Sequence, residues 1–113
     1  MTKRELSQIL HETGAAVGEG EQFLIDSDAF PKAAYFEILW DDNMASGDDY
    51  EEYVTYQISF ASKRPRDPAL VDLKRRLNDA GFHPQISHEY VNGDKGPAYY
   101  HSYFSVTVEE RLT

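Results

Sequence analysis

The chain has 113 residues, with 20 Asp and Glu against 11 Lys and Arg, so its formal net charge is -9. The absence of cysteine excludes a disulfide framework and any metal site built on thiolates. The excess of acid argues against sequence-independent binding to nucleic acid, which needs Lys and Arg side chains over the phosphates. Eight Tyr, six Phe and one Trp supply enough apolar surface for a domain that folds without disulfide bonds or a structural metal.

The N-terminal segment, residues 1–14, is predicted to be a helix. Thr2 with Glu5 three residues later matches a capping box, and Gly14 offers the left-handed conformation in which helices often end. The apolar residues between them recur on one face. Residues 15–32 are predicted to be a loop, because glycine and proline interrupt them and they show little periodicity.

Two strands are predicted next, at residues 33–41 and 52–61, because apolar residues recur at every second position along both. In the first strand the row expected to face the core is wholly apolar and consists of Ala34, Phe36, Ile38 and Trp40. In the second strand the inward row consists of Val54, Tyr56, Ile58 and Phe60. Between the strands, residues 41–49 form an acidic insert that is too polar to belong to the core.

A central helix and a final pair of strands complete the chain. Asp67 is a good N-cap, Pro68 suits the first helical position, and Gly81 closes the helix. Strands are predicted at residues 85–91 and 98–108, and the turn between them contains Asn, Gly and Pro. The apolar row of the last strand consists of Tyr100, Phe104, Val106 and Val108, with Ser102 as its one small polar member.

This order of elements, helix, strand, strand, helix, strand, strand, predicts an α+β fold. About four mainly antiparallel strands are expected in one sheet, with the N-terminal helix and the central helix packed on it. The whole chain, residues 1–113, is expected to form a single domain in which residues 33–110 supply the sheet and the central helix. No signal peptide is apparent and no apolar run is long enough to cross a bilayer, so a soluble protein is expected.

Acidic and basic residues are unevenly distributed along the chain. Residues 1–60 carry 13 acidic and 3 basic side chains, whereas residues 61–113 carry 7 acidic and 8 basic ones. Six of the basic residues lie close together in the sequence: Lys63, Arg64, Arg66, Lys74, Arg75 and Arg76. A molecule with an acidic side and a basic side suits head-to-tail association, in which one face docks on a different face of a neighbour. The alternative is an ordinary solvated surface.

The sequence contains no recognisable catalytic or metal-binding motif. Residues 41–52 begin and end like a calcium-binding loop, but Ala45 and Ser46 stand where that geometry needs an acid and a glycine. His88 and His101 could approach each other across the last hairpin, which is short of the three or four ligands that a metal needs. The phosphate-binding glycine loop, the nucleophile elbow and a cysteine nucleophile are all missing. We therefore expect no enzyme activity, no cofactor and no metal.

Aromatic residues also occur on the strand faces opposite the apolar rows. Tyr53, Tyr99, Tyr103 and His101 occupy these positions. A sheet with aromatic residues on both faces either is covered on both sides or presents one face to a partner, and tyrosine is common at protein interfaces. Two predicted helices are too few to cover both faces of such a sheet. A protein partner is therefore favoured on the uncovered face.

Several segments together carry a resemblance to a known family. They are residues 33–40 (AAYFEILW), the acidic turn ending at residues 47–50 (GDDY), residues 53–60 (YVTYQISF), residues 66–68 (RDP) with the helix that follows, residues 88–91 (HEYV) and residues 99–106 (YYHSYFSV). In this pattern the chain resembles, over residues 30–110, the small tail-completion or tail-terminator proteins of long-tailed bacteriophages and prophages. It departs from them at Asp49, where Asn is common, and at residues 60–62, where the strand end is often more polar.

The resemblance implies a structural role in the virion. Proteins of this family cap the tail tube, usually as a six-membered ring, and join it to the head-completion proteins. The implied partners are therefore the tail-tube protein, the head-completion protein and further copies of the chain. DNA would pass through the ring without being specifically bound, no membrane would be involved, and assembly would take place in the host cytoplasm.

Two groups of residues are candidates for the contact surfaces of such a ring. The acidic group, expected to face the lumen or a partner, comprises Asp41, Asp42, Asp48, Asp49, Glu51 and Glu52. The group expected at the subunit interface comprises Tyr53, Lys63, Arg64, Arg66, Tyr99 and Tyr103. A polarised charge distribution gives each subunit the two unlike faces that a ring requires. The rival hypothesis is a small acidic α+β protein-binding module of regulatory or immunity type, which could mimic DNA.

Neutralising the acidic group tests its part in this role. Replacing Asp48, Asp49, Glu51 and Glu52 by Asn and Gln is expected to impair head–tail joining or DNA passage, because a lumen that passes DNA must repel phosphate. The measurement is the yield of infectious particles. A normal yield from the variant would contradict the hypothesis.

Overall fold

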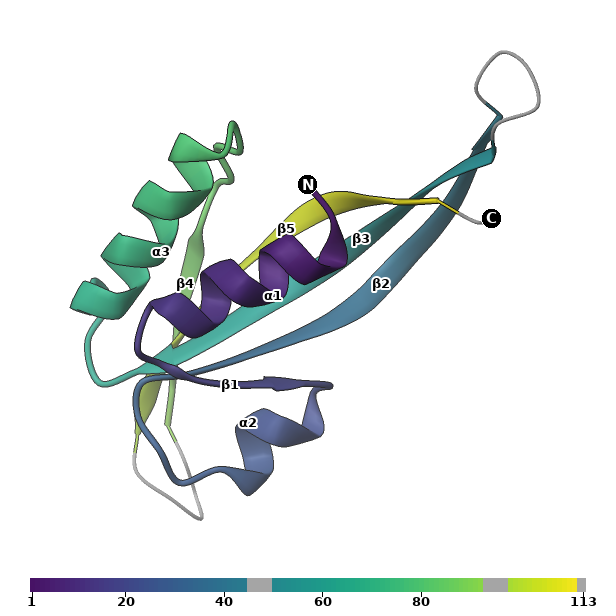
Figure 1. Cartoon of the computed structure of the whole chain (residues 1–113). Helices are drawn as coiled ribbons and strands as arrows, with labels where there is room; N and C mark the ends of the chain where they lie inside the picture. The colour runs from purple at the N-terminus through teal and green to yellow at the C-terminus, as the bar shows by residue number, and fades with distance from the viewer. Residues whose placement is uncertain (45–49, 93–97, 112–113) are drawn as a thin grey trace.

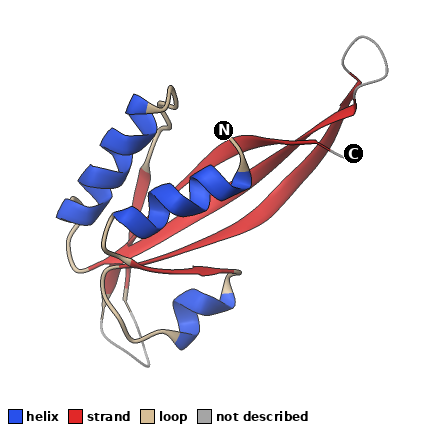
Figure 2. Ribbon diagram, in the orientation of Figure 1, coloured by secondary structure: helices blue, strands red, loops and turns tan. Residues whose placement is uncertain are grey.

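The computed structural model describes residues 1–44, 50–92 and 98–111. In chain order its elements are α1 (Lys3–Glu12), β1 (Ala16–Glu19), α2 (Gln22–Asp26), β2 (Lys32–Met44), β3 (Tyr50–Ser62), α3 (Pro68–Asp79), β4 (Ser87–Val91) and β5 (Tyr99–Arg111). The strands form one sheet in the order β1-β2-β3-β5-β4, in which β1 and β2 are parallel and the other neighbours antiparallel (Figure 1, Figure 2). The predicted α+β class is confirmed, with five strands in place of about four. None of the described helices is long and apolar enough to span a membrane.

Helices α1 and α3 cover one face of the sheet (Figure 1). Each buries a stripe of leucines, made up of Leu6 and Leu10 on α1 and Leu70, Leu73 and Leu77 on α3. The buried strand residues beneath them include Val54, Tyr56, Ile58, Phe60, Phe104, Val106 and Val108. The predicted inward rows of β3 and β5 are therefore confirmed. Full burial of a large apolar side chain contributes about 1.5–3 kcal/mol, so this layer is the main source of hydrophobic stabilisation.

Both long helices begin and end where the sequence places their caps. The Thr2 hydroxyl accepts a hydrogen bond from an amide of the first turn at 3.2 Å, and the Asp67 carboxylate does the same at 2.9 Å. Gly14 and Gly81 follow the helices with φ of 85° and 91°, which is the left-handed region expected at helix ends. Local chemistry thus fixes the ends of α1 and α3.

The prediction of a loop over residues 15–32 is wrong in part, because two short elements lie there. Strand β1 pairs in parallel with β2, with Ala16 opposite Lys32. Helix α2 packs on β1 and β2, on the side of the sheet opposite α1 and α3. A Cβ atom on Gly18 would lie 2.3 Å from the ring of Phe23, so glycine permits this close approach. Elements of four and five residues are too short to show a periodic pattern.

The predicted inward row of β2, which runs from Ala34 to Trp40, is also wrong. Ala33 and Tyr35 contact the core beneath the helices, one position out of step with the prediction. A β-bulge at Ile38 then shifts the register, so Trp40 returns to the helix side of the sheet. The sequence could not reveal the phase, because the strand begins with two alanines that fit either face.

Strands β2 and β3 continue beyond the helices as a long hairpin (Figure 1). Each has 13 residues, so the first strand ends later than the predicted residue 41 and the second begins earlier than the predicted residue 52. Strand β5 accompanies the hairpin, with Glu51 opposite Arg111. Polar side chains do not stop these strands, because pairing satisfies the backbone N–H and C=O groups whichever side chains they carry. The molecule is elongated, with extents of 52, 27 and 20 Å.

Lys32 is buried at the start of β2 and ties the α2 segment to the sheet. Its ammonium donates hydrogen bonds to the carbonyl oxygens of Leu24, at 2.5 Å, and Ser27, at 2.6 Å. It also lies 4.7 Å from the centre of the Phe30 ring, within range of a cation–π interaction. Burial lowers the pKa of this ammonium below its usual 10.5.

Replacing Lys32 by Met is expected to destabilise the fold, because two carbonyl groups at the end of α2 lose their donor. The free energy of unfolding, measured by urea titration, should fall by about 1–3 kcal/mol. Lys74→Met, at an exposed position of α3, is the matched control and should change it by less than about 0.5 kcal/mol. Equal stabilities of the two variants would show that the Lys32 contacts are dispensable.

Candidate functional site

Large apolar side chains are exposed on the part of β2 that leaves the body of the molecule. Ile38, Leu39 and Trp40 are 51%, 56% and 62% exposed. They lie between Glu37 and Asp41, which are also exposed, and we call these five residues the arm segment. The register of β2 with β3 places Leu39 and Trp40 on opposite faces of the strand, so apolar side chains are exposed on both sides of this segment. Large exposed apolar side chains gathered in one place are uncommon on monomeric proteins and mark sites of association. The arm segment is therefore the first candidate for a binding surface.

The backbone of the arm segment is also unpaired on its outer side. Strand β1 pairs with β2 only from Lys32 to Tyr35, and the Gly20 amide, which donates to the Tyr35 carbonyl at 2.9 Å, ends that contact. Farther along β2, no strand in the described part of the chain pairs with this edge. A sheet edge with free N–H and C=O groups can accept a strand from another chain. The arm segment thus combines a free edge with an apolar surface.

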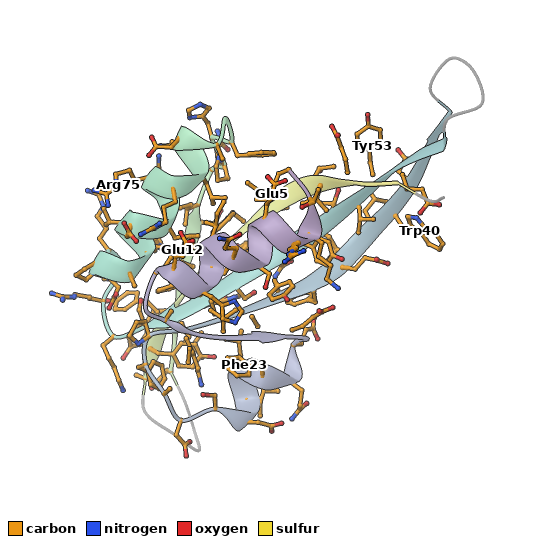
Figure 3. The ribbon with its side chains drawn as sticks, viewed as in Figure 1. Glu5, Glu12, Phe23, Trp40, Tyr53 and Arg75 are labelled. Atoms are coloured by element: carbon orange, nitrogen blue, oxygen red, sulfur yellow. The ribbon has the colours of Figure 1, made fainter. Side chains whose placement is uncertain are left out.

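Trp40 is anchored across the hairpin by Glu52. The indole Nε1 donates to the Glu52 Oε2 at 2.8 Å, and Glu52 is 6% exposed, whereas Trp40 lies far out on the hairpin (Figure 3). The expectation that Glu52 faces a partner directly is therefore wrong, because its carboxylate is engaged and buried. Asp41 is exposed on the same strand as Trp40. The side chains of the other acidic candidates lie outside the described residues: Asp42, Asp48, Asp49 and Glu51.

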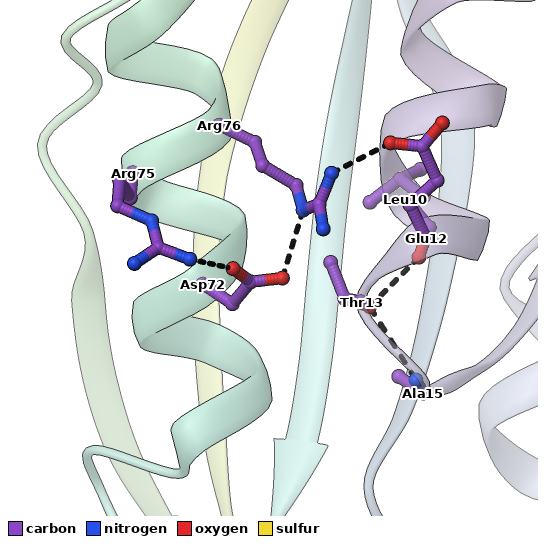
Figure 4. Close-up of polar contacts among 7 residues, drawn as sticks. All are labelled: Leu10, Glu12, Thr13, Ala15, Asp72, Arg75 and Arg76. Carbon is purple, nitrogen blue, oxygen red and sulfur yellow. Dashed lines mark hydrogen bonds and ion pairs between the residues drawn. The ribbon is translucent and has the colours of Figure 1, made fainter.

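The six clustered basic residues do not form one patch. Arg75 and Arg76 are engaged by Asp72, at 2.5 Å and 2.8 Å, and Arg76 also reaches Glu12 on α1 at 2.6 Å (Figure 4). This network joins the two helices. The hydrogen bond from Arg76 is the main cause that lowers the pKa of the Asp72 carboxyl, and the same bond raises the pKa of Arg76.

The other four basic residues are dispersed. Lys63 lies 4.3 Å from the centre of the Phe30 ring, and Arg64 is exposed in the turn after β3. Arg66 and Lys74 line a groove between α3 and the segment that enters β4. Within residues 1–44, 50–92 and 98–111, neither of these two side chains forms an ion pair. They are the members of the basic cluster that line this groove and are available to a partner there.

This groove has a volume of about 700 Å³. Its lining combines apolar and basic side chains, among them Leu70, Val71, Ile86, Arg66, Lys74 and His88. Leu70 is buried and Ile86 half-buried, whereas Val71 is 54% exposed. The groove therefore offers an apolar surface next to positive charge.

The candidate tyrosines lie on the face of the sheet opposite α1 and α3, and Tyr53, Tyr99 and Tyr103 are half-buried there. The Tyr99 ring lies 5.9 Å from that of Phe30, and the Tyr103 ring lies 5.1 Å from that of His101. These contacts within the molecule use part of each ring. The tyrosine face is a second possible contact surface, less exposed than the arm segment.

The histidines of the last hairpin do not approach each other. His88 lies opposite Ser102 and His101 opposite Glu89, so the two rings are on opposite faces of the sheet. The His88 Nδ1 is hydrogen-bonded to the Ser102 Oγ at 2.7 Å, but Ser102 is completely buried and cannot reach a substrate. Among the described residues, no three His, Asp or Glu side chains are grouped so that they could hold a metal ion.

Comparison with models of known protein families gives no match, and comparison with curated proteins gives none either. Of the predicted acidic group, Asp41 lies exposed on the β2–β3 hairpin, whereas the apolar residues beside it are not among the predicted site residues. Three consecutive apolar residues, 38–40, interrupt the alternation of β2, and that interruption is the signal that could have revealed the arm segment.

Asp72→Asn is expected to remove a pH-dependent contribution to stability. The pKa of Asp72 is lower in the folded protein than in the unfolded chain, so its ionised form stabilises the fold above about pH 4. That contribution is lost as the pH falls further, through the pKa of the folded state. Melting temperatures at neutral pH and at about pH 3 should therefore differ less in the variant than in the wild type.

Asp79→Asn is the control for this experiment, because it changes the charge of α3 equally at an exposed position outside the network. The same pH profile in the wild type and both variants would contradict a stabilising role for Asp72.

Proposed function

We propose that the chain is a structural tail-completion protein of a long-tailed bacteriophage or prophage. It closes the head-proximal end of the tail tube as a ring and joins the tube to the head. Its partners in the virion are the tail-tube protein, the head-completion protein and other copies of itself. The resemblance carried by residues 30–110 supports this role, and so does the arm segment.

The exposed arm segment is the strongest support for this role. Each subunit of a ring buries one surface against each neighbour, and stable protein interfaces cover about 1,200 Å² or more in total. A free strand edge next to Ile38, Leu39 and Trp40 is a surface that favours burial against another protein. Its place on a hairpin that projects from the body allows it to reach a neighbouring subunit (Figure 1).

The distribution of charge also supports a ring through which DNA passes. The chain has a net charge of -9, and Glu37 and Asp41 are exposed on the projecting hairpin. Negative charge repels the phosphates of the genome, so DNA that moves through the ring is not retained. The tyrosine face is a second surface of different chemistry, which suits contact with a tube or head protein.

The rival role, an acidic module that binds a basic protein partner, uses the same arm segment but does not require a ring. Electron microscopy of tails assembled without the chain separates the two roles. We expect added protein to form a ring at the head-proximal end of the tube and to restore head joining. Protein that stays monomeric and ignores the tubes would contradict the proposal and favour the rival.

Two matched variants link that result to the arm segment. Leu39→Asp places a charge at the centre of the arm segment and should abolish binding to the tubes, because the ionised carboxylate cannot be buried without a partner. Ile25→Asp places the same charge on α2 at a residue that is 74% exposed, and it should bind like the wild type. Binding by both variants would show that the arm segment is not part of the contact.

A further inference from the structure

We infer that the groove between α3 and β4 of one copy receives the arm segment of the next copy. This contact presupposes the proposed ring and identifies the surfaces that would close it. The groove and the arm segment lie at opposite sides of the sheet, because β4 is its last strand and the arm segment belongs to β2, three strands away. A chain therefore cannot fill its own groove with its own arm.

The two surfaces are complementary in chemistry. In the arm segment, three apolar residues lie between the carboxylates of Glu37 and Asp41. In the groove, the apolar side chains around Val71 lie near the cations of Arg66 and Lys74. None of these four charged side chains forms an ion pair within the described part of the structure. Apolar contact in the centre with opposite charges at the rim is the usual anatomy of a protein interface.

The dimensions of the two surfaces also agree. Side chains two residues apart on a strand point to the same face and lie about 7 Å from each other. Leu39 and Asp41 are such a pair, since their partners on β3 are Thr55 and Tyr53, whereas Glu37 lies opposite Tyr56 and points to the other face. On α3, Val71 and Lys74 are three residues apart on one side of the helix, about 4.5 Å along its axis. With this face of the arm segment against α3, Leu39 meets Val71 and the Asp41 carboxylate reaches Lys74.

The topology makes this contact repeat from copy to copy. Strand β4 pairs only with β5 among the described strands, and four of its five residues are exposed, so its outer edge is free. A contact between β2 of one copy and the β4 side of another leaves the same two surfaces unoccupied at the ends of the pair. Such a head-to-tail interface continues until the rotation between copies closes a ring.

A second copy of the chain is the occupant that the charges favour. The protein has a net charge of -9, so copies repel each other unless acid meets a local positive surface. The groove supplies that surface, because Arg66 and Lys74 are exposed there. An acidic arm segment placed on these cations offsets the repulsion at the point where the copies touch.

Cysteine cross-linking tests the contact, because the chain has no cysteine of its own. Leu39→Cys and Val71→Cys are prepared as separate variants, mixed, and oxidised both free in solution and on tail tubes. We expect a disulfide-linked dimer with one copy of each variant, since the arm of one copy meets the groove of the other. Ser105→Cys, exposed on β5 and outside both surfaces, mixed with Val71→Cys is the control and should give only background cross-linking.

The outcomes separate this contact from the proposed ring. Assembly without the cross-link between Leu39→Cys and Val71→Cys would overturn the contact and leave the ring standing, whereas no assembly in solution or on tubes would overturn both.

Charge reversal provides a second readout of the same contact. Lys74→Glu is expected to weaken assembly about fivefold, and Asp41→Lys in the same chain should restore it. A double variant as weak as the single one would contradict the pairing.

Discussion

Backbone N–H and C=O groups in a strand need partners, and the outer edge of β2 beyond Tyr35 lacks a strand to supply them in the described structure. The arrangement of the other strands and helices leaves that edge exposed to solvent. Strand β3 pairs with the other edge of β2 along its length, and β5 pairs with β3 in turn. The indole of Trp40 is hydrogen-bonded to the buried Glu52. Around the bulge at Ile38, the strand carries three adjacent exposed apolar residues.

The body of the protein serves as a rigid support for this hairpin. The leucine stripes of α1 and α3 pack on the same face of the sheet, and the network around Asp72 joins the two helices at their surface. On the other face, Lys32 binds the end of α2. A projecting strand with exposed apolar side chains is costly in water, and it is stable when another protein covers it. In the proposed ring, a neighbouring copy covers this strand. The acidic arm segment then meets the basic side chains of the neighbour's groove.

Much of this fold follows from local signals in the sequence. Thr2 and Asp67 cap their helices as predicted, and the alternation of β3 identifies its inward row, because these signals depend only on neighbouring residues. Strand β1 and helix α2 are too short to repeat a periodic pattern often enough to be predicted. The burial of Glu52 depends on a residue across the hairpin, and the phase of β2 depends on a bulge. Neither is encoded in a local pattern, so the apolar run at residues 38–40 is visible in the sequence but its exposure is known only from the structure.

Hydrogen exchange of the free and assembled protein tests most directly whether another copy covers the β2 edge. In the free protein, amides that point outward between residues 36 and 44 should exchange fast, because no strand in the described structure pairs with them there. On assembly, we expect these residues and those of β4 to become protected together. Protection confined to the tyrosine face of β5, with exchange of β2 unchanged, would contradict the account.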